Sequence, residues 1–268
     1  LAHTVANALK LVELIDAPTP VFAGCAVPLV RPAEGAAFVH GADGFGDTGR
    51  PPPSRRRDGA HAADALRRFA HERPGATLVA LAPLTNLALA LRLDPELPSR
   101  FGRLVVMAGA ATGRGNTQRV PAEFNAGFDP EAAHVVFSSW PEFDLVDWEA
   151  CVRHAIGFER FDRLVEAGDE RARFYAAISR TARRFNEARG RDGMVAADAL
   201  AMAVALAPEL VRRAERHHVG VELDGTLTRG ATVVDWEDRL GLAANARIVL
   251  EVDQARFEAL VAGALGAA

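Results

Sequence analysis

The sequence predicts an α/β fold with a mainly parallel, open sheet that is flanked by helices and followed by a C-terminal β segment. Strand-length apolar runs alternate with amphipathic helical patterns through the first 150 residues, and this alternation favours parallel strands. The run Arg103–Ala110 is apolar almost throughout, which is typical of a strand covered on both faces. Three β-like segments follow near the end of the chain.

The first elements follow from apolar spacing and from the positions of proline and glycine. Apolar residues at i, i+3 and i+4 predict a helix from Val5 to Ile15, which ends before Pro18. Pro20–Gly24 predicts a short buried strand. Arg31–Asp58 contains many glycines and prolines and predicts a long loop, a feature that is often functional in a compact domain.

The middle of the chain predicts a strand, a turn and a helix in succession. Ala62–Phe69 has a helical pattern, and Thr77–Leu91 reads as a strand, a tight turn at Pro83 and a helix capped by Thr85. After the strand at Arg103–Ala110, Asp129 is expected to cap a helix whose first residue is Pro130. The next strand is expected at residues 142–148.

Helices and then β segments are expected in the remaining part of the chain. The helical patterns cover residues 158–165, 170–188 and 196–207, and the β patterns cover 217–225, 231–236 and 246–253. Asp253 is expected to cap a final helix. Because no internal repeat is present, we expect one domain over residues 1–268.

Composition narrows the class of protein. The chain has 268 residues, 49% hydrophobic and 25% charged, which is ordinary globular composition. Its net charge of −4 gives no reason to expect nucleic acid or an acidic membrane as partner. Cys25 and Cys151 do not form a disulfide framework, and no apolar run has membrane-spanning length. We therefore expect a cytoplasmic protein.

Two segments carry the functional signal. Gly113–Ala133 places Asn116, Glu123 and Asn125 on a glycine-rich stretch between a strand and a helix. A carboxylate and two amides on such a loop suit a polyhydroxylated ligand such as a sugar ring. The other segment, HGADGFGD (His40–Asp47), lacks the ligand spacing of an EF-hand, so by itself it reads as a glycine-rich turn with local aspartate hydrogen bonds.

Two further features are ambiguous by themselves. The turn Leu81–Asn86 ends a strand, and this edge is where open α/β folds usually bind ligands. Asp198 begins an otherwise apolar helix, where the helix dipole favours an acid even without any function.

Taken in order, these segments resemble the nucleoside hydrolase family (inosine-uridine preferring nucleoside hydrolase-like), over Leu1 to about Phe257. The family carries an HGxDGxGD-like motif, a GPLTN turn and a sugar-binding loop. It also carries a His-Asp pair that precedes a PLAVA-like motif. Its N-terminal DxDPGxDD motif has no match here. The resemblance therefore implies a chain that begins roughly 40 residues late in the family layout, without the first strand or strands of the fold.

The resemblance also implies roles for individual residues. Asn116, Glu123 and Asn125 would hold the ribose hydroxyls, with Met107 on the pocket wall and His40 near the base. The Leu81 backbone carbonyl and Asp198 would ligate calcium, and Asp198 would also touch the ribose. The general base would lie in the absent motif.

Ala197 stands at the histidine position, so the resemblance leaves purine or pyrimidine preference open.

The function implied is hydrolysis of the N-glycosidic bond of ribonucleosides to free base and ribose, by a water molecule that calcium positions. The alternative is an inactive short form that binds nucleoside or ribose or acts as an interaction protein, because one carboxylate and one carbonyl fall short of the 6–8 oxygen ligands of calcium. A different α/β enzyme using Asp198 and Glu123 as acid and base also stays open, although G-x-S-x-G, P-loop and HExxH motifs are absent. The resemblance further implies a homo-oligomer, a dimer or tetramer.

Overall fold

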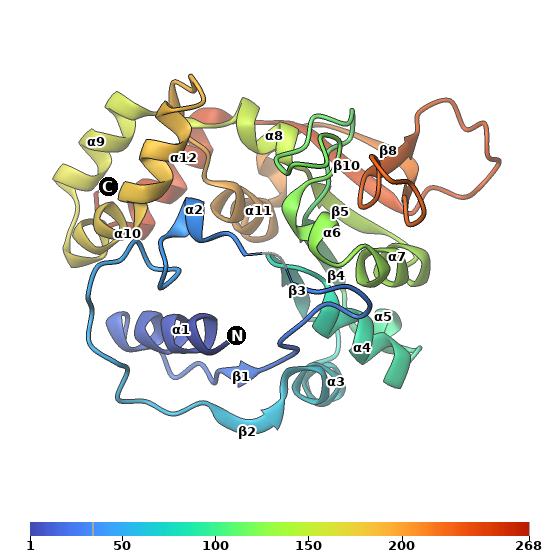
Figure 1. Ribbon diagram of the computed structural model, residues 1–268, viewed down its shortest axis with the longest axis horizontal. Coiled ribbons are helices and arrows are strands. Elements are labelled where there is room, and N and C mark those ends of the chain that lie inside the picture. The colour runs from blue at the N-terminus through green and yellow to red at the C-terminus, as the bar shows by residue number, and fades with distance from the viewer. Residues whose placement is uncertain (34, 268) are drawn as a thin grey trace.

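A six-stranded sheet forms the centre of the molecule (Figure 1). The computed structural model describes residues 1–33 and 35–267. The strand order is β3-β4-β5-β10-β8-β9, with parallel pairing from β3 to β10 and antiparallel pairing of β10 with β8 and of β8 with β9. The bounds are β3 Thr77–Ala80, β4 Arg103–Met107, β5 Phe143–Val146, β8 Val211–Val221, β9 Thr232–Asp235 and β10 Ala246–Val252. The predicted mainly parallel sheet with a C-terminal β segment is confirmed.

The two faces of the sheet are both apolar because successive side chains of a strand point to opposite sides. Leu104 and Val106 belong to one core cluster, whereas Val105 and Met107 belong to the other. All four are buried, as the continuous apolar run predicted. In contrast, β3 ends the sheet and its apolar side chains are only half-buried.

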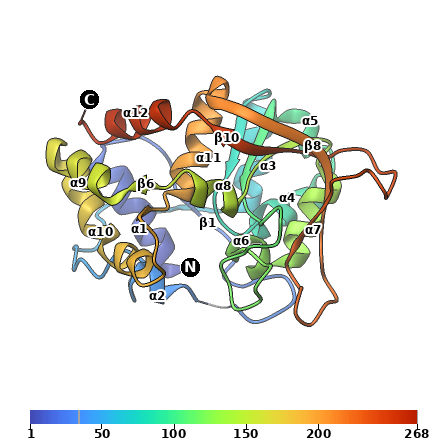
Figure 2. The same ribbon diagram turned by 90° about the horizontal axis from the view of Figure 1, so that it is seen from above.

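Helices pack in both clusters, and Figure 2 shows the layers from above. The first cluster contains residues of α3 Ala62–Glu72, α4 Thr85–Leu93, α5 Leu97–Arg100 and α7 Pro130–Ser139. The second contains residues of α8 Trp148–Arg153, α9 Phe158–Ala167, α10 Glu170–Glu187, α11 Ala197–Leu206 and α12 Gln254–Ala264. The smaller elements are α6 Phe124–Phe128, η1 Pro208–Leu210 and the antiparallel pair β6 Ile156–Gly157 with β7 Gly193–Met194. None of the helices described here is long and apolar enough to cross a bilayer.

The N-terminal part forms a layer of its own beside this sheet (Figure 1). It contains α1 Ala2–Leu14, β1 Phe22–Ala23 and β2 Asp58–His61, and β1 pairs with β2 in parallel. The short helix α2 Ala37–His40, which lies between these two strands in the chain, packs against α10 instead. The amide of Cys25 donates to Asn86 Oδ1 (2.7 Å), and the amide of Leu29 donates to Asp129 Oδ2 (3.0 Å). These two bonds tie the layer to α4 and to the start of α7.

Four local predictions need correction. The strand expected at Pro20–Gly24 is only two residues long and half-buried, and the long loop contains the four-residue helix α2. Strand β8 begins at Val211, six positions earlier than expected, because its exposed arginines hide the alternation. Thr85 does not cap α4, because it is the first residue of the helix and Leu84 stands at the N-cap position; its hydroxyl donates to Asp129 Oδ2 (2.7 Å).

The two predicted aspartate caps are confirmed. Asp129 accepts a hydrogen bond from the amide of Ala132 at the start of α7, and Pro130 is the first residue of that helix. Asp253 accepts from the amide of Arg256 and begins α12. Each carboxylate satisfies a backbone N–H that the first helical turn leaves without a partner.

Candidate active site

Polar groups converge at the carboxyl ends of β3 and β4. The side-chain amide of Asn125 donates to the Met107 carbonyl (2.9 Å) and lies 3.4 Å from the Leu81 carbonyl. Its nitrogen also lies 3.3 Å from the Met107 sulfur. The structure thus brings together Leu81, Met107 and Asn125 at the edge of the sheet where open α/β folds usually bind ligands.

Glu123 is buried beside this group and caps α6. Its Oε2 accepts hydrogen bonds from the amides of Gly109 (2.9 Å), Asn125 (2.8 Å) and Ala126 (3.2 Å). Burial raises the pKa of Glu123 to about 7; the backbone hydrogen bonds oppose this shift, and the charge of Asp198 adds to it. The buried carboxyl therefore takes up a proton more readily than an exposed glutamate.

Asp198 lies in the first turn of α11, which packs against β4. Its side chain reaches solvent, yet desolvation raises its pKa to about 6. The charge of Asp198 also acts on Glu123 and on the phenol of Tyr175 in α10, so these three groups lie near one another.

Asn116 lies on the loop between β4 and α6. Its Oδ1 accepts a hydrogen bond from the amide of Phe124 (2.8 Å), which turns the side chain toward the start of α6. Among the described residues, the NH₂ group of Asn116 donates to no acceptor, so that group is available to a ligand.

His40 is placed differently from the other predicted residues. It ends α2, which packs against α10, and its carbonyl accepts from the amide of Gly46 (2.8 Å). Desolvation lowers the pKa of the exposed His40 imidazole. In the part of the chain that the structure describes, no hydrogen bond links His40 to Asn125 or Glu123.

The residues present do not fit a calcium ion by themselves. No group of three or more His, Cys, Asp or Glu side chains is arranged to hold a metal within residues 1–33 and 35–267. Asp198 and the Leu81 carbonyl supply two kinds of oxygen, whereas calcium takes 6–8 oxygen ligands. No chemical step is therefore assigned to a metal here.

Sequence reasoning missed three side chains that shape the site. Asp147 and Glu149 at the start of α8, and Thr232 in β9, accept hydrogen bonds from the backbone just after β4. Asp147 was expected only as a strand residue, and Thr232 lies 122 positions from its partner Ala110. No motif or residue spacing in the sequence predicts contacts between residues that lie so far apart in the chain.

Comparison with known proteins decides the family. The model of the inosine-uridine preferring nucleoside hydrolase family matches residues 1–259. The non-specific ribonucleoside hydrolase RihC of Klebsiella pneumoniae is 36% identical over 256 residues, covering 95% of this chain and 82% of the relative. RihC of Salmonella enteritidis is 37% identical over 272 residues, covering 97% and 83%.

The chain belongs to the nucleoside hydrolase family. A solved inosine-guanosine nucleoside hydrolase superposes with a TM-score of 0.91 at 34% identity, covering 98% of this chain and 86% of that one. A solved plant nucleoside hydrolase gives a TM-score of 0.90 at 28% identity, covering 100% and 87%. The fold expected from the resemblance is confirmed, and this nucleoside hydrolase is assigned to the N-ribosyl hydrolases.

Proposed function

We propose that this nucleoside hydrolase cleaves the N-glycosidic bond of ribonucleosides to free base and ribose, with the ribose held between β4, α6 and α11. The observation that carries the proposal is the convergence of Leu81, Met107, Glu123 and Asn125 at the carboxyl edge of the sheet. The family resemblance assigns Glu123 and Asn125 to the ribose hydroxyls and Met107 to the pocket wall. It assigns the Leu81 carbonyl to calcium.

Three polar groups that have no hydrogen-bond partner among the described residues define the sugar grip. The NH₂ group of Asn125 donates to the Met107 carbonyl, so its Oδ1 is left to accept a hydrogen bond from a hydroxyl. Asn116 is the reverse case, because its Oδ1 is bonded and its NH₂ group can donate. Glu123 binds three amides through Oε2, which leaves Oε1 for a second hydroxyl. A vicinal diol offers both donors and acceptors and matches this set.

The same site suits the charge that develops during the reaction. Hydrolysis passes through an oxocarbenium-like ribosyl centre, which is positive. Ionised Glu123 and Asp198 are desolvated carboxylates that would stabilise this positive charge. We assign no described residue as general base for the attacking water.

The leaving base receives no help from the residue at the family's histidine position. Ala197 begins α11 and carries no ionisable group. The proton for the departing base must therefore come from another donor or from solvent. This difference bears on the choice among bases, and the choice is best measured with a panel of substrates.

Calcium is proposed as the cofactor on the family resemblance alone. The shortage of oxygen ligands described above favours a second candidate function, namely binding of nucleoside or ribose without turnover. The two candidates share the sugar grip and differ in catalysis, so one experiment separates them.

The test measures ribose release from inosine, adenosine, uridine and cytidine, with calcium or with chelator, together with calorimetric binding of the same nucleosides. Turnover supports hydrolysis, and chelator sensitivity supports the calcium proposal. Binding without turnover supports the second candidate, and absence of both overturns both candidates.

Asn125→Ala tests the sugar grip within the same experiment. We expect nucleoside affinity to fall at least about tenfold, because one hydroxyl contact and the orientation of the Met107 carbonyl are lost. Asn245→Ala is the matched control, since Asn245 is equally buried and bonds the Phe137 and Val219 carbonyls away from the site. Equal losses in the two variants would contradict the assignment.

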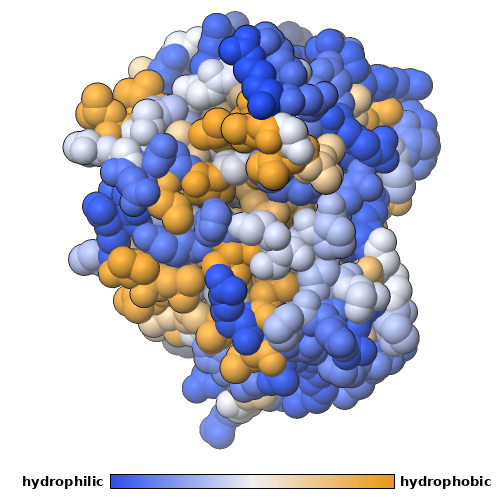
Figure 3. Space-filling view, turned by 90° about the vertical axis from the view of Figure 1, so that its right-hand side faces the viewer, coloured by the Kyte–Doolittle hydropathy of each residue, from blue (hydrophilic) through white to orange (hydrophobic). Residues whose placement is uncertain are grey.

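We also propose a cytoplasmic, single-domain protein that assembles as a homo-oligomer, with no nucleic acid or membrane partner. Exposed Leu227, Val233, Leu240 and Leu242 on and around β9 support self-association. The side of the molecule that carries strands β8 and β9 and the segment between them shows apolar patches between hydrophilic ones (Figure 3). Light scattering after gel filtration would give the mass, and a monomer at micromolar concentration would contradict this proposal.

A further inference from the structure

The backbone that follows β4 is held by side chains from several other elements. The amide of Gly109 donates to Glu123 (2.9 Å), that of Ala110 to Thr232 Oγ1 (2.9 Å) and that of Ala111 to Asp147 Oδ2 (2.7 Å). The next amides donate to one carboxylate oxygen, Glu149 Oε1, from Thr112 (2.9 Å) and from Arg114 (3.0 Å). Five amides in six residues are thus oriented by α6, β9 and α8.

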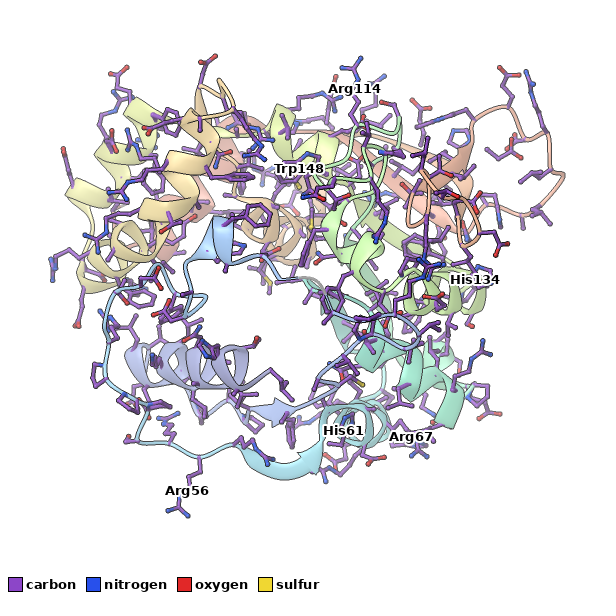
Figure 4. The ribbon with its side chains drawn as sticks, viewed as in Figure 1. Arg56, His61, Arg67, Arg114, His134 and Trp148 are labelled. Carbon is purple, nitrogen blue, oxygen red and sulfur yellow. The ribbon has the colours of Figure 1, made fainter. Side chains whose placement is uncertain are left out.

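Glu149 is the outermost of these acceptors. Its second oxygen, Oε2, accepts from the hydroxyl of Thr112 (2.7 Å), so the carboxylate makes three bonds to the loop. It lies in the first turn of α8, where the helix dipole favours a negative charge. Figure 4 shows the Arg114 side chain pointing away from the body of the molecule, so the loop is gripped there through its backbone.

The backbone between Arg114, which Glu149 holds, and Asn116, the proposed sugar-binding residue, is closely constrained. The amides of Gly115 and Asn116 donate to the carbonyls of Val120 (3.0 Å) and Ala122 (3.2 Å) on the returning chain. A Cβ at Gly115 would lie 2.2 Å from the Ala122 oxygen, which shows how tightly the two strands of the loop meet. Displacement of Arg114 would therefore be transmitted to Asn116.

We propose that Glu149 is a positioning residue for ribose binding, which fixes the loop from Thr112 to Asn116 without touching the ligand. The inference rests on the proposed function, because it assigns Asn116 to the sugar. Loss of the anchor requires the loop to become ordered when the ligand binds, so ligand affinity falls while the chemical step is little changed.

Three variants separate positioning from a general structural effect. Glu149→Ala removes all three bonds. Glu149→Gln keeps an oxygen for the two amides, and its NH₂ group can donate to the Thr112 hydroxyl, so it should restore the anchor. Glu159→Ala is the matched control, because Glu159 is an exposed first-turn acid of the neighbouring helix α9.

The experiment combines hydrogen exchange of the unliganded chain with calorimetric binding of inosine and, where turnover is present, KM and kcat. In Glu149→Ala we expect exchange at Thr112 and Arg114 to rise at least about tenfold. We expect the dissociation constant or KM to rise about tenfold, with kcat within about twofold. Glu149→Gln should return all values close to wild type, and Glu159→Ala should change none of them.

Two outcomes overturn the positioning role while the proposed function stands. One is unchanged exchange in Glu149→Ala, and the other is faster exchange with unchanged inosine affinity. If the wild-type chain binds none of the four nucleosides, the proposed function fails and the positioning role fails with it. Hydrogen exchange then still decides whether Glu149 anchors the loop.

Discussion

The two glycine-rich segments of this nucleoside hydrolase are held in opposite ways. In the turn His40–Asp47, Asp43 Oδ1 accepts from the amides of Phe45 (2.6 Å) and Asp47 (3.0 Å), and Asp47 Oδ1 accepts from the amide of Asp43 (3.1 Å). In the loop from Gly109 to Glu123, the acceptors lie up to 122 positions away. The amides of the turn bond mainly to its own aspartates, whereas several amides at the start of the loop bond to side chains of β9 and of the start of α8.

The conformation of the turn therefore depends mostly on its own residues, whereas the conformation of the loop after β4 depends on distant elements of the fold. The turn bonds mainly to its own aspartates, with one further bond from the Asn7 side chain of α1 to the Asp43 carbonyl (2.8 Å). It meets α10 through Phe45 and Phe174, whose ring centroids are 5.1 Å apart. The loop acquires its form only when α6, α8 and β9 are in place. Disturbance of the loop should therefore cost global stability, whereas disturbance of the turn should stay local.

Glu123 should give the largest effect. Glu123→Ala leaves three amides without an acceptor in a buried site, so we expect a loss of about 3–5 kcal/mol in the free energy of unfolding. Asp253→Ala, which removes the cap of α12, should cost only about 1 kcal/mol. Urea unfolding measures both, and equal costs would mean that the buried amides find other partners.

Asp147 should make stability depend on pH. Burial is the largest cause that raises its pKa from 3.8 to about 6, so the folded chain holds a proton that the unfolded chain releases. Its contribution is fully present below the unfolded pKa and is lost as pH rises through about 6, by up to about 3 kcal/mol. Urea unfolding at pH 4 and 7 should show a smaller decline in Asp147→Asn than in wild type. Identical declines would contradict the assignment.

Gly46 tests the contact between the turn and α10. Its φ is +69°, and a Cβ there would lie 2.7 Å from the Ile178 carbonyl oxygen, so Gly46→Ala should cost about 2–3 kcal/mol. Gly49→Ala is the control, because Gly49 has φ +65° but nothing within 4 Å. It should cost about 1 kcal/mol. Thermal unfolding that ranks the two variants equally would show that the turn is not docked against α10.

Asp43 should give the smallest effect. Desolvation raises its pKa, but hydrogen bonds from the amides of Phe45 and Asp47 outweigh this and lower it overall. Asp43→Ala should cost about 1 kcal/mol and accelerate hydrogen exchange at Phe45 and Asp47 only. Faster exchange in the loop after β4 would show that the two segments are coupled after all.

The sequence predicted more of the fold than of the contacts within the site. A buried strand was predicted over Arg103–Ala110 because the run is almost entirely apolar, although β4 ends three residues earlier, at Met107. Asp129 was recognised as a cap because Pro130 follows it. Thr85 was misassigned because α4 begins at Thr85 itself, one residue earlier than the apolar pattern indicated, which leaves Leu84 at the N-cap position. The roles of Asn116, Glu123, Asn125, Asp198 and His40 are still proposals, and the structure shows only which of them lie together.

By itself, the sequence determined the alternation of strands and helices, the parallel sheet, the two aspartate caps and membership of the nucleoside hydrolase family. These properties depend on apolar periodicity and on short motifs, which lie within a few residues of one another. Only the tertiary structure decided that Glu123 is desolvated, that His40 lies against α10, and that Asp147, Glu149 and Thr232 orient the loop after β4. Burial and long-range hydrogen bonds depend on which distant segments meet, and that is fixed only when the whole chain packs.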